Sequence, residues 1–297
     1  MEGQRNRPRG RGLRVALLLT AVFLVVEFVG GILTGSLALQ ADAGHMLSDV
    51  ASLGMALLAF RFARRPATPA KTFGFYRAEI LAAFMNGIVL VAVSGGIVYE
   101  ALRRIASVPQ VQSLPMLLIA CMGLAVNAVS AWVLFREQGQ SLNERGAFLH
   151  VVADALGSVG AIIAGILMLT LQWYLADPII SRVIALLIAA GSWRLLRETT
   201  HILMEGAPPR IDLAEVRSAM AEARGVEKVH DLHIWTLTSG FEALSAHVLL
   251  KPDCSTRDRK AVLTALQEIL HARYNIDHTT IQIEEEPRVH QPGSTHP

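Results

Sequence analysis

Six long apolar stretches constrain the fold of this chain more than any other feature. They lie near residues 13–35, 37–60, 79–99, 113–135, 143–171 and 178–197. A helix of about 20 apolar residues is long enough to cross the roughly 30 Å hydrocarbon core of a bilayer. Such a helix also satisfies its own backbone hydrogen bonds where water is absent. The sequence therefore predicts an all-α bundle of six membrane-spanning helices.

Basic residues are unevenly distributed over the loops that join these stretches. Five arginines precede the first stretch, and the loop before the third stretch carries Arg61, Arg64, Arg65, Lys71 and Arg77. The loops on the opposite side hold only Arg103 and Arg104. Because Lys and Arg accumulate on the cytoplasmic side of membrane proteins, we expect both termini in the cytoplasm. The short loops, which lack a histidine-rich insertion, favour a bacterial plasma membrane.

The composition changes after Gly206, where Pro208 and Pro209 interrupt the helical pattern. Beyond them, the spacing of apolar residues predicts a helix at 211–224, strands at 226–237 and 241–250, a helix at 256–273 and a strand at 276–284. This order suggests a small two-layer α+β domain. We predict a basic segment (1–12), a transmembrane domain (13–205), a cytoplasmic domain (206–286) and a disordered tail (287–297).

Composition excludes two other classes of protein. The mean hydropathy is +0.41 and the net charge only +2, and the basic residues lie beside apolar stretches instead of forming one basic face. Nucleic acid is therefore not an expected partner. The two cysteines, Cys121 and Cys254, provide neither a disulfide framework nor a thiolate metal site.

Two of the apolar stretches carry the same pair of ionisable residues. The second contains His45 and Asp49, and the fifth contains His150 and Asp154, each pair four residues apart. Residues at this spacing share one face of a helix. Burying such groups in a membrane costs about 2.5–3.5 kcal/mol each, so they are expected to have a function. Two nitrogens and two carboxylate oxygens form a tetrahedral set suited to Zn²⁺. The alternative is a separate His–Asp hydrogen bond within each helix.

Three other polar residues lie within the predicted spans. Asp42 precedes His45 by three residues and shares its helix face, so it would guide ions or orient a ligand. Glu27 and Asn127 would line the same cavity or hold helices together by hydrogen bonds. We regard all three as candidates for the ion pathway and not as ligands.

The C-terminal domain has candidate ligands of its own. His230 and His247 fall on the two adjacent predicted strands, with His233 nearby, and the last strand would bring Glu284 close to them. The alternative is that these histidines face solvent, where they need no partner.

Several motifs together resemble the cation diffusion facilitator family. They are the two HxxxD pairs, FGFYRAEILAAFMNG at 73–87, YEALRRI at 99–105, HDLHIWTLTSG at 230–240 and SAHV at 245–248. The resemblance extends over about residues 13–286. It implies a homodimer of six-helix protomers with metallochaperone-like cytoplasmic domains, working as a metal–proton antiporter, in which residues 206–286 serve metal sensing and dimerisation. It also implies that His45 favours zinc with cadmium as a second substrate, and that His278 or Glu284 is a further cytoplasmic ligand.

Zinc requires neutral imidazoles and ionised carboxylates, so metal binding releases protons. We therefore predict a secondary transporter that exports Zn²⁺, and also Cd²⁺ and Co²⁺, in exchange for protons by alternating access. No cofactor is expected beyond Zn²⁺ as substrate and regulatory ligand. One alternative is a broader metal range that includes Fe²⁺ and Mn²⁺. Others are an intramembrane metallohydrolase, which would need an open metal position and a general base, and a membrane metal sensor that does not transport.

Overall fold

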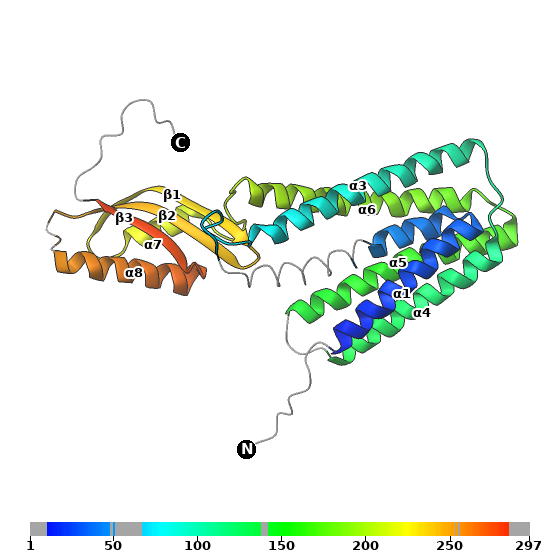
Figure 1. The fold of residues 1–297 in the computed structure, drawn as a ribbon, viewed down its shortest axis with the longest axis horizontal. Helices are drawn as coiled ribbons and strands as arrows, with labels where there is room; N and C mark the ends of the chain where they lie inside the picture. The colour runs from blue at the N-terminus through cyan, green and yellow to red at the C-terminus, as the bar shows by residue number, and fades with distance from the viewer. Residues whose placement is uncertain are drawn as a thin grey trace, which may run out of the picture. The chain divides into compact units, whose positions relative to one another are not determined.

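A computed structural model describes residues 11–47, 50, 67–137, 142–252, 254 and 256–284 (Figure 1). For residues 11–17, 131, 133–137, 142–154, 256 and 257 the description covers the backbone alone. Most of the predicted basic segment (1–12), Asp49 and the predicted disordered tail (287–297) lie outside the described residues. The chain forms two compact units.

Long helices at the positions of the apolar stretches form the first unit, apart from their residues 77–81 and 197–203, which belong to the second unit. The helices are α1 (Arg11–Thr34), α3 (Arg77–Ala106), α4 (Ser113–Glu137), α5 (Leu142–Leu171) and α6 (Ala176–Leu203), with a further helical segment at 37–47. Within the described residues, three helices are long and apolar enough to cross a membrane: Arg77–Ala106, Ser113–Ser130 and Ala176–Leu203. Shorter apolar helices cover Leu18–Thr34 and Ala155–Leu171.

Large apolar side chains cover the outside of this unit. Leu33, Leu156 and Leu187 expose 71%, 69% and 69% of their surface, whereas Glu27 and Asp42 expose 0% and 2%. Apolar side chains outside and acidic side chains inside reverse the pattern of a soluble protein. This arrangement suits helices that contact lipid, and it agrees with the predicted helical membrane domain.

The helical segment 37–47 joins two groups of helices within this unit. Figure 1 shows α1, α4 and α5 side by side, and α3 beside α6. Leu39 lies in a buried cluster with Met116 of α4 and Ala161 of α5. Ala41, two residues later, lies in another with Leu90 of α3 and residues of α6. The segment therefore packs against both groups.

A buried carboxylate fixes the start of this segment. Asp177, in the first turn of α6, accepts hydrogen bonds from Ser36 Oγ (2.5 Å), the Leu37 amide (2.8 Å) and the Ala38 amide (3.1 Å). The first amides of a helix have no partner within the helix itself. Asp177 satisfies two of them from a distant part of the chain, which lets the segment begin inside the bundle.

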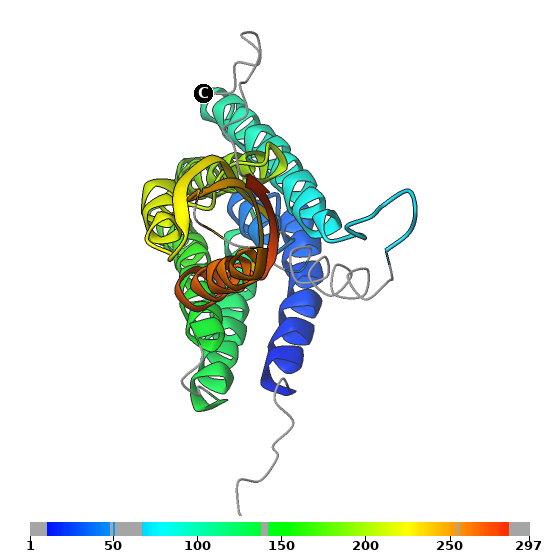
Figure 2. The ribbon, with the colours of Figure 1, turned by 90° about the vertical axis from the view of Figure 1, so that its left-hand side faces the viewer.

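The second unit contains the predicted α+β domain in its predicted order. The elements are α7 (Leu213–Ala221), β1 (Val226–Thr238), β2 (Phe241–Leu250), α8 (Thr256–Tyr274) and β3 (His278–Glu284). β1 pairs with β2 in antiparallel fashion, and β3 pairs with the other edge of β2 in parallel fashion. The parallel pairing requires a crossover, which α8 provides beside β3 (Figure 2).

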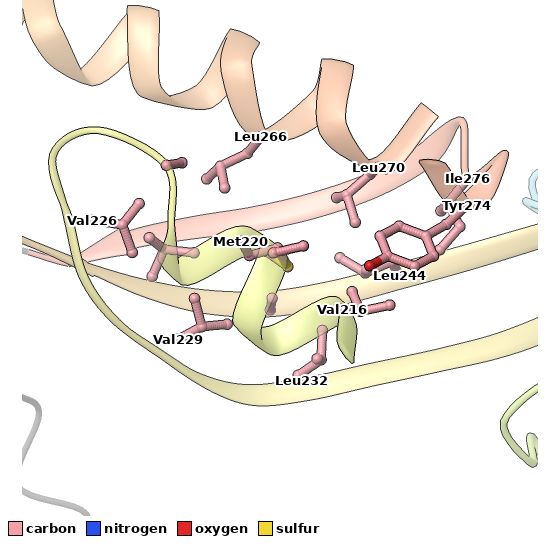
Figure 3. Close-up of a cluster of buried hydrophobic side chains, with 14 of the residues drawn as sticks. Val216, Met220, Val226, Val229, Leu232, Leu244, Leu266, Leu270, Tyr274 and Ile276 are labelled. Atoms are coloured by element: carbon pink, nitrogen blue, oxygen red, sulfur yellow. The ribbon is translucent and has the colours of Figure 1, made fainter. Parts of the chain in front are cut away.

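One buried cluster joins the two helices of this domain to the sheet (Figure 3). Leu266 and Leu270 of α8, Met220 of α7 and Leu244 of β2 are each 0% exposed. The spacing of Leu266 and Leu270 is one helical turn, so both point to the same side of α8. Burying a side chain of this size contributes roughly 1.5–3 kcal/mol, so this cluster holds the sheet that carries the histidines.

Residues 67–81 belong to the same compact unit as the C-terminal domain. Ser239 Oγ donates a hydrogen bond to Glu79 Oε1 at 3.0 Å, and Thr238 Oγ1 donates to the other oxygen of that carboxylate. Arg77 forms an ion pair with Glu205 at 2.8 Å. The first turn of α3 is thus bonded to the turn between β1 and β2.

Candidate metal centres

The register of the sheet brings two histidines and one glutamate together. His230 of β1 is directly opposite His247 of β2. On the other side of β2, His247 is opposite Gln282 and Leu249 is opposite Glu284 of β3. Residues 282 and 284 point to the same face, because side chains alternate along a strand. Glu284 therefore lies beside the histidine pair, as the sequence suggested.

The three side chains are in direct contact. His230 donates from Nε2 to Glu284 Oε2, and His247 donates from Nδ1 to Glu284 Oε1, both at 3.0 Å. The side chain of Glu284 is 3% exposed, whereas His230 and His247 are 25% and 23% exposed. One potential ligand atom from each residue lies within 4.8 Å of the others. The buried carboxylate is thus covered by two imidazoles that remain accessible from solvent.

The histidines determine the protonation of the glutamate. Burial alone would raise the pKa of Glu284, but the hydrogen bond from His230 and the positive charges of His247 and His230 lower it further than burial raises it. The net effect is a pKa below the ordinary value of a glutamate. Glu284 is therefore an anion at neutral pH, which is the form that binds metals.

A nearby aspartate is an additional ligand candidate that the sequence analysis missed. Asp231 has a positive φ of 51° where the pairing of β1 with β2 shifts between His230 and His233. Its Oδ2 lies 3.7 Å from His247 Nε2, and its Oδ1 accepts a hydrogen bond from His233 Nε2 at 3.0 Å. The sequence HDLH placed Asp231 between two histidines, but an unbroken strand would have turned it to the opposite face from His230.

The structure does not bring His278 to this cluster. His278 begins β3, opposite Ala243, six residues before Glu284. Its ring lies edge to face with Phe73 at 5.3 Å and with Phe241 at 6.1 Å between ring centres. His233 reaches the cluster only through Asp231.

The predicted membrane ligands fall partly within the described residues. His45 is half-buried on the helical segment 37–47. Asp49 lies outside the described residues. For His150 and Asp154 on α5, the structure describes the backbone but not the side chain. The four-residue membrane centre therefore stays a prediction.

The pathway candidates form one buried polar cluster. Asp42 accepts a hydrogen bond from Ser158 Oγ of α5 at 3.1 Å, and Asn127 Nδ2 of α4 donates to the same Oγ at 3.5 Å. Glu27 of α1 interacts with Asp42. The sequence analysis identified three members of this cluster but missed Ser158.

Comparison with known protein families assigns the membrane candidates and the cytoplasmic candidates to two different domains. Residues 13–204 match the cation efflux transmembrane domain, and residues 208–286 match the cytoplasmic domain of cation efflux proteins. The chain belongs to the cation efflux family. The predicted membership of the cation diffusion facilitators is confirmed, and with it the predicted class: a transporter and not a metallohydrolase.

Curated cation efflux proteins are similar to this chain over most of its length. A cadmium, cobalt and zinc/H⁺-K⁺ antiporter from Bacillus velezensis is 41% identical over 92% of this chain and 87% of its own length. The metal cation efflux system protein CzcD from Cupriavidus metallidurans is 43% identical over 93% and 87%, respectively. The zinc transporter ZitB from Escherichia coli is 44% identical over 93% and 88%.

One solved structure is similar to part of this cation efflux protein. It is the metal-bound C-terminal domain of the CzcD transporter from Cupriavidus metallidurans, which is 40% identical. The match covers 25% of this chain and 100% of that one, with a TM-score of 0.24.

Proposed function

We propose that this chain exports Zn²⁺, and also Cd²⁺ and Co²⁺, from the bacterial cytoplasm in exchange for protons. The observation that carries the proposal is the similarity of more than nine-tenths of the chain to a cadmium, cobalt and zinc/H⁺-K⁺ antiporter and to a zinc transporter. The match to a cation efflux cytoplasmic domain supports the further proposal that two copies of the chain work together. The distribution of basic residues supports a plasma-membrane protein with both termini in the cytoplasm.

The transported ion would bind to His45, Asp49, His150 and Asp154. All four residues fall inside the matched transmembrane domain. Two imidazoles and two carboxylates give a neutral centre around Zn²⁺, and protonation of the same groups would release the ion. Alternating access would open this centre first to one side of the membrane and then to the other.

The cytoplasmic cluster would bind a second, regulatory zinc ion. His230, His247 and Glu284 come from three strands, and Asp231 could complete a tetrahedral set. Small rotations of these side chains would bring them to the 2.0–2.2 Å bonds that Zn²⁺ prefers. The partial exposure of both histidines allows the ion to exchange with the cytosol, as a sensor of zinc concentration requires.

Purified protein in liposomes tests the proposed exchange. An acidic lumen should drive Zn²⁺ uptake, read with a metal-sensitive dye inside, while a pH dye records protons leaving. Zinc uptake without proton movement would contradict antiport. Absence of uptake of all three metals by well-inserted protein would contradict the transport function.

The substitution His45→Asp should relax the choice of metal. It replaces an imidazole nitrogen, which suits Zn²⁺, with a carboxylate oxygen, which suits harder ions such as Mn²⁺. It also adds a negative charge that attracts any divalent ion. Competitive uptake of zinc against manganese should therefore shift toward manganese in the variant. His45→Ala, which removes a ligand without supplying a new one, should instead lose uptake of both metals. An unchanged ratio in His45→Asp with substantial flux would show that His45 does not set selectivity.

A further inference from the structure

The buried polar cluster inside the helical unit is distinct from the proposed metal ligands. Its members come from four parts of the chain: Glu27 of α1, Asp42 of the segment 37–47, Asn127 of α4 and Ser158 of α5. Their exposed fractions are 0%, 2%, 5% and 1%. Two acidic groups are therefore fully enclosed by helices that face lipid.

The two carboxyl groups differ in their hydrogen-bond partners. Asp42 accepts a hydrogen bond from Ser158, which in turn accepts one from Asn127. Neither oxygen of Glu27 has a hydrogen-bond donor among the described residues. Glu27 and Asp42 lie close enough to bond to each other. Because neither is a donor when ionised, this bond exists only when one of them carries a proton.

Two glycines make room for these carboxyl groups. A Cβ atom on Gly157 would lie 2.2 Å from Asp42 Oδ1. A Cβ atom on Gly123 would lie 2.7 Å from Glu27 Oε1 and 3.2 Å from Ser158 Oγ. Any other residue at either position would displace an acidic side chain, so the backbones of α4 and α5 are shaped to hold both acids.

Charge decides what this cluster can bind. An ionised carboxylate without a donor or a cation is costly in a low-dielectric interior, and two adjacent carboxylates are more costly still. The titratable group on the same helical segment is His45, one turn after Asp42, and the neighbouring groups on α4 and α5 are the neutral Asn127 and Ser158. Among the described side chains, no lysine or arginine interacts with Glu27. The smallest cation that neutralises the pair is a proton.

We propose that Glu27 and Asp42 hold one exchangeable proton between them and form a proton site of the antiporter in addition to the metal ligands. This inference rests on the proposed metal–proton exchange and assigns part of its proton movement to particular residues. A divalent ion bound through His45, one helical turn from Asp42, would favour the doubly ionised pair by Coulomb attraction. Metal binding would then expel the proton, and return of the proton would weaken metal binding.

The substitution Glu27→Gln tests the proposal, because glutamine has the shape of a protonated glutamate but cannot release a proton. Its amide can donate to Asp42 in place of the shared proton, so the variant should fold and insert. In liposomes with an acidic lumen, pH-driven Zn²⁺ accumulation should fall by roughly 5- to 150-fold, the usual range for coupling between two sites. Fewer protons should leave per zinc ion. Exchange of zinc across the membrane should persist after the proton gradient has been collapsed.

Matched variants and a spectroscopic measurement separate this effect from general damage. Asp42→Asn should reproduce the loss of pH drive, whereas Glu198→Gln, the same change at an exposed site on α6, should leave it intact. The infrared C=O band of a protonated carboxyl should be present in the parent protein and absent from Glu27→Gln. An unchanged proton-to-zinc ratio and an unchanged band in well-folded Glu27→Gln would overturn the proposal.

Failure of the proposed function has a different outcome. In that case the parent protein itself moves zinc without protons, or moves no metal. The infrared band still tests whether Glu27 and Asp42 share a proton, because it requires no transport.

Discussion

Zinc transport should be abolished by Asp154→Ala, and equally by Asp49→Ala, in protein that remains folded and inserted. Each change would leave the proposed membrane centre with three ligands and an uncompensated positive charge in a low-dielectric site. Loss of a residue that only supports a ligand already costs about 10- to 100-fold in metal affinity, so loss of a charged ligand should cost more. The measurement is zinc uptake into liposomes, with folding checked by the elution profile of the purified protein and insertion by the amount of protein recovered with the liposomes.

Two further variants make this prediction specific. Asp154→Asn keeps the shape and one oxygen of the ligand but removes its charge, so its transport should fall between that of the parent and that of Asp154→Ala. Glu268→Ala removes an acid exposed on α8 and should leave transport unchanged. Near-normal zinc flux in Asp49→Ala or Asp154→Ala would exclude that residue from the transported-metal site.

Glu284→Gln should remove the proposed cytoplasmic metal centre. Glu284 is the buried anion to which His230 and His247 both donate, and a neutral amide cannot replace its charge. We expect zinc affinity at this centre to fall by more than about 100-fold, beyond the usual cost of losing a supporting residue. Titration with Co²⁺, followed by competition with Zn²⁺, measures the loss in the full chain. The titration is done with Asp154→Ala also present, so that the membrane centre contributes little.

The same variant changes the response of the domain to acid. The lowered pKa of Glu284 means that its bonds stabilise the metal-free fold fully above the ordinary glutamate value, about 4.3. That contribution is lost as the pH falls through the lowered pKa, and Glu284→Gln should lack this dependence. Glu268→Gln, at an exposed site, should behave as the parent does in both measurements. Unchanged metal affinity in Glu284→Gln would show that the histidines bind metal without it.

Hydrophobic pattern was sufficient to predict the elements of the fold. Among the described residues, the apolar stretches matched the helices because their length reflects the thickness of a bilayer. The order of helices and strands after Gly206 followed from the change between helical and alternating periodicity. The same alternation placed His230 and His247 on neighbouring strands. They lie opposite each other because of the position of the turn between the strands, which the TSG sequence indicated.

Contacts between distant segments could not be predicted in this way. Nothing in the local sequence showed that Asp177 would supply partners to the amides of Leu37 and Ala38, more than a hundred residues away. The approach of Asp231 to His247 depends on an irregularity in β1, since a regular strand would point the carboxylate to the other face. Ser158 entered the polar cluster because α5 packs beside the segment 37–47, which helical periodicity does not reveal.

The position of Glu284 on the last strand also has a consequence for biosynthesis. The two histidines are on the first two strands, whereas β3 follows α8 in the chain and is therefore synthesised last. Both imidazoles of a nascent chain leave the ribosome before their carboxylate partner does. The proposed cytoplasmic centre can be complete only after residue 284 has been synthesised, so a product truncated before this residue would contain both histidines and still lack the centre.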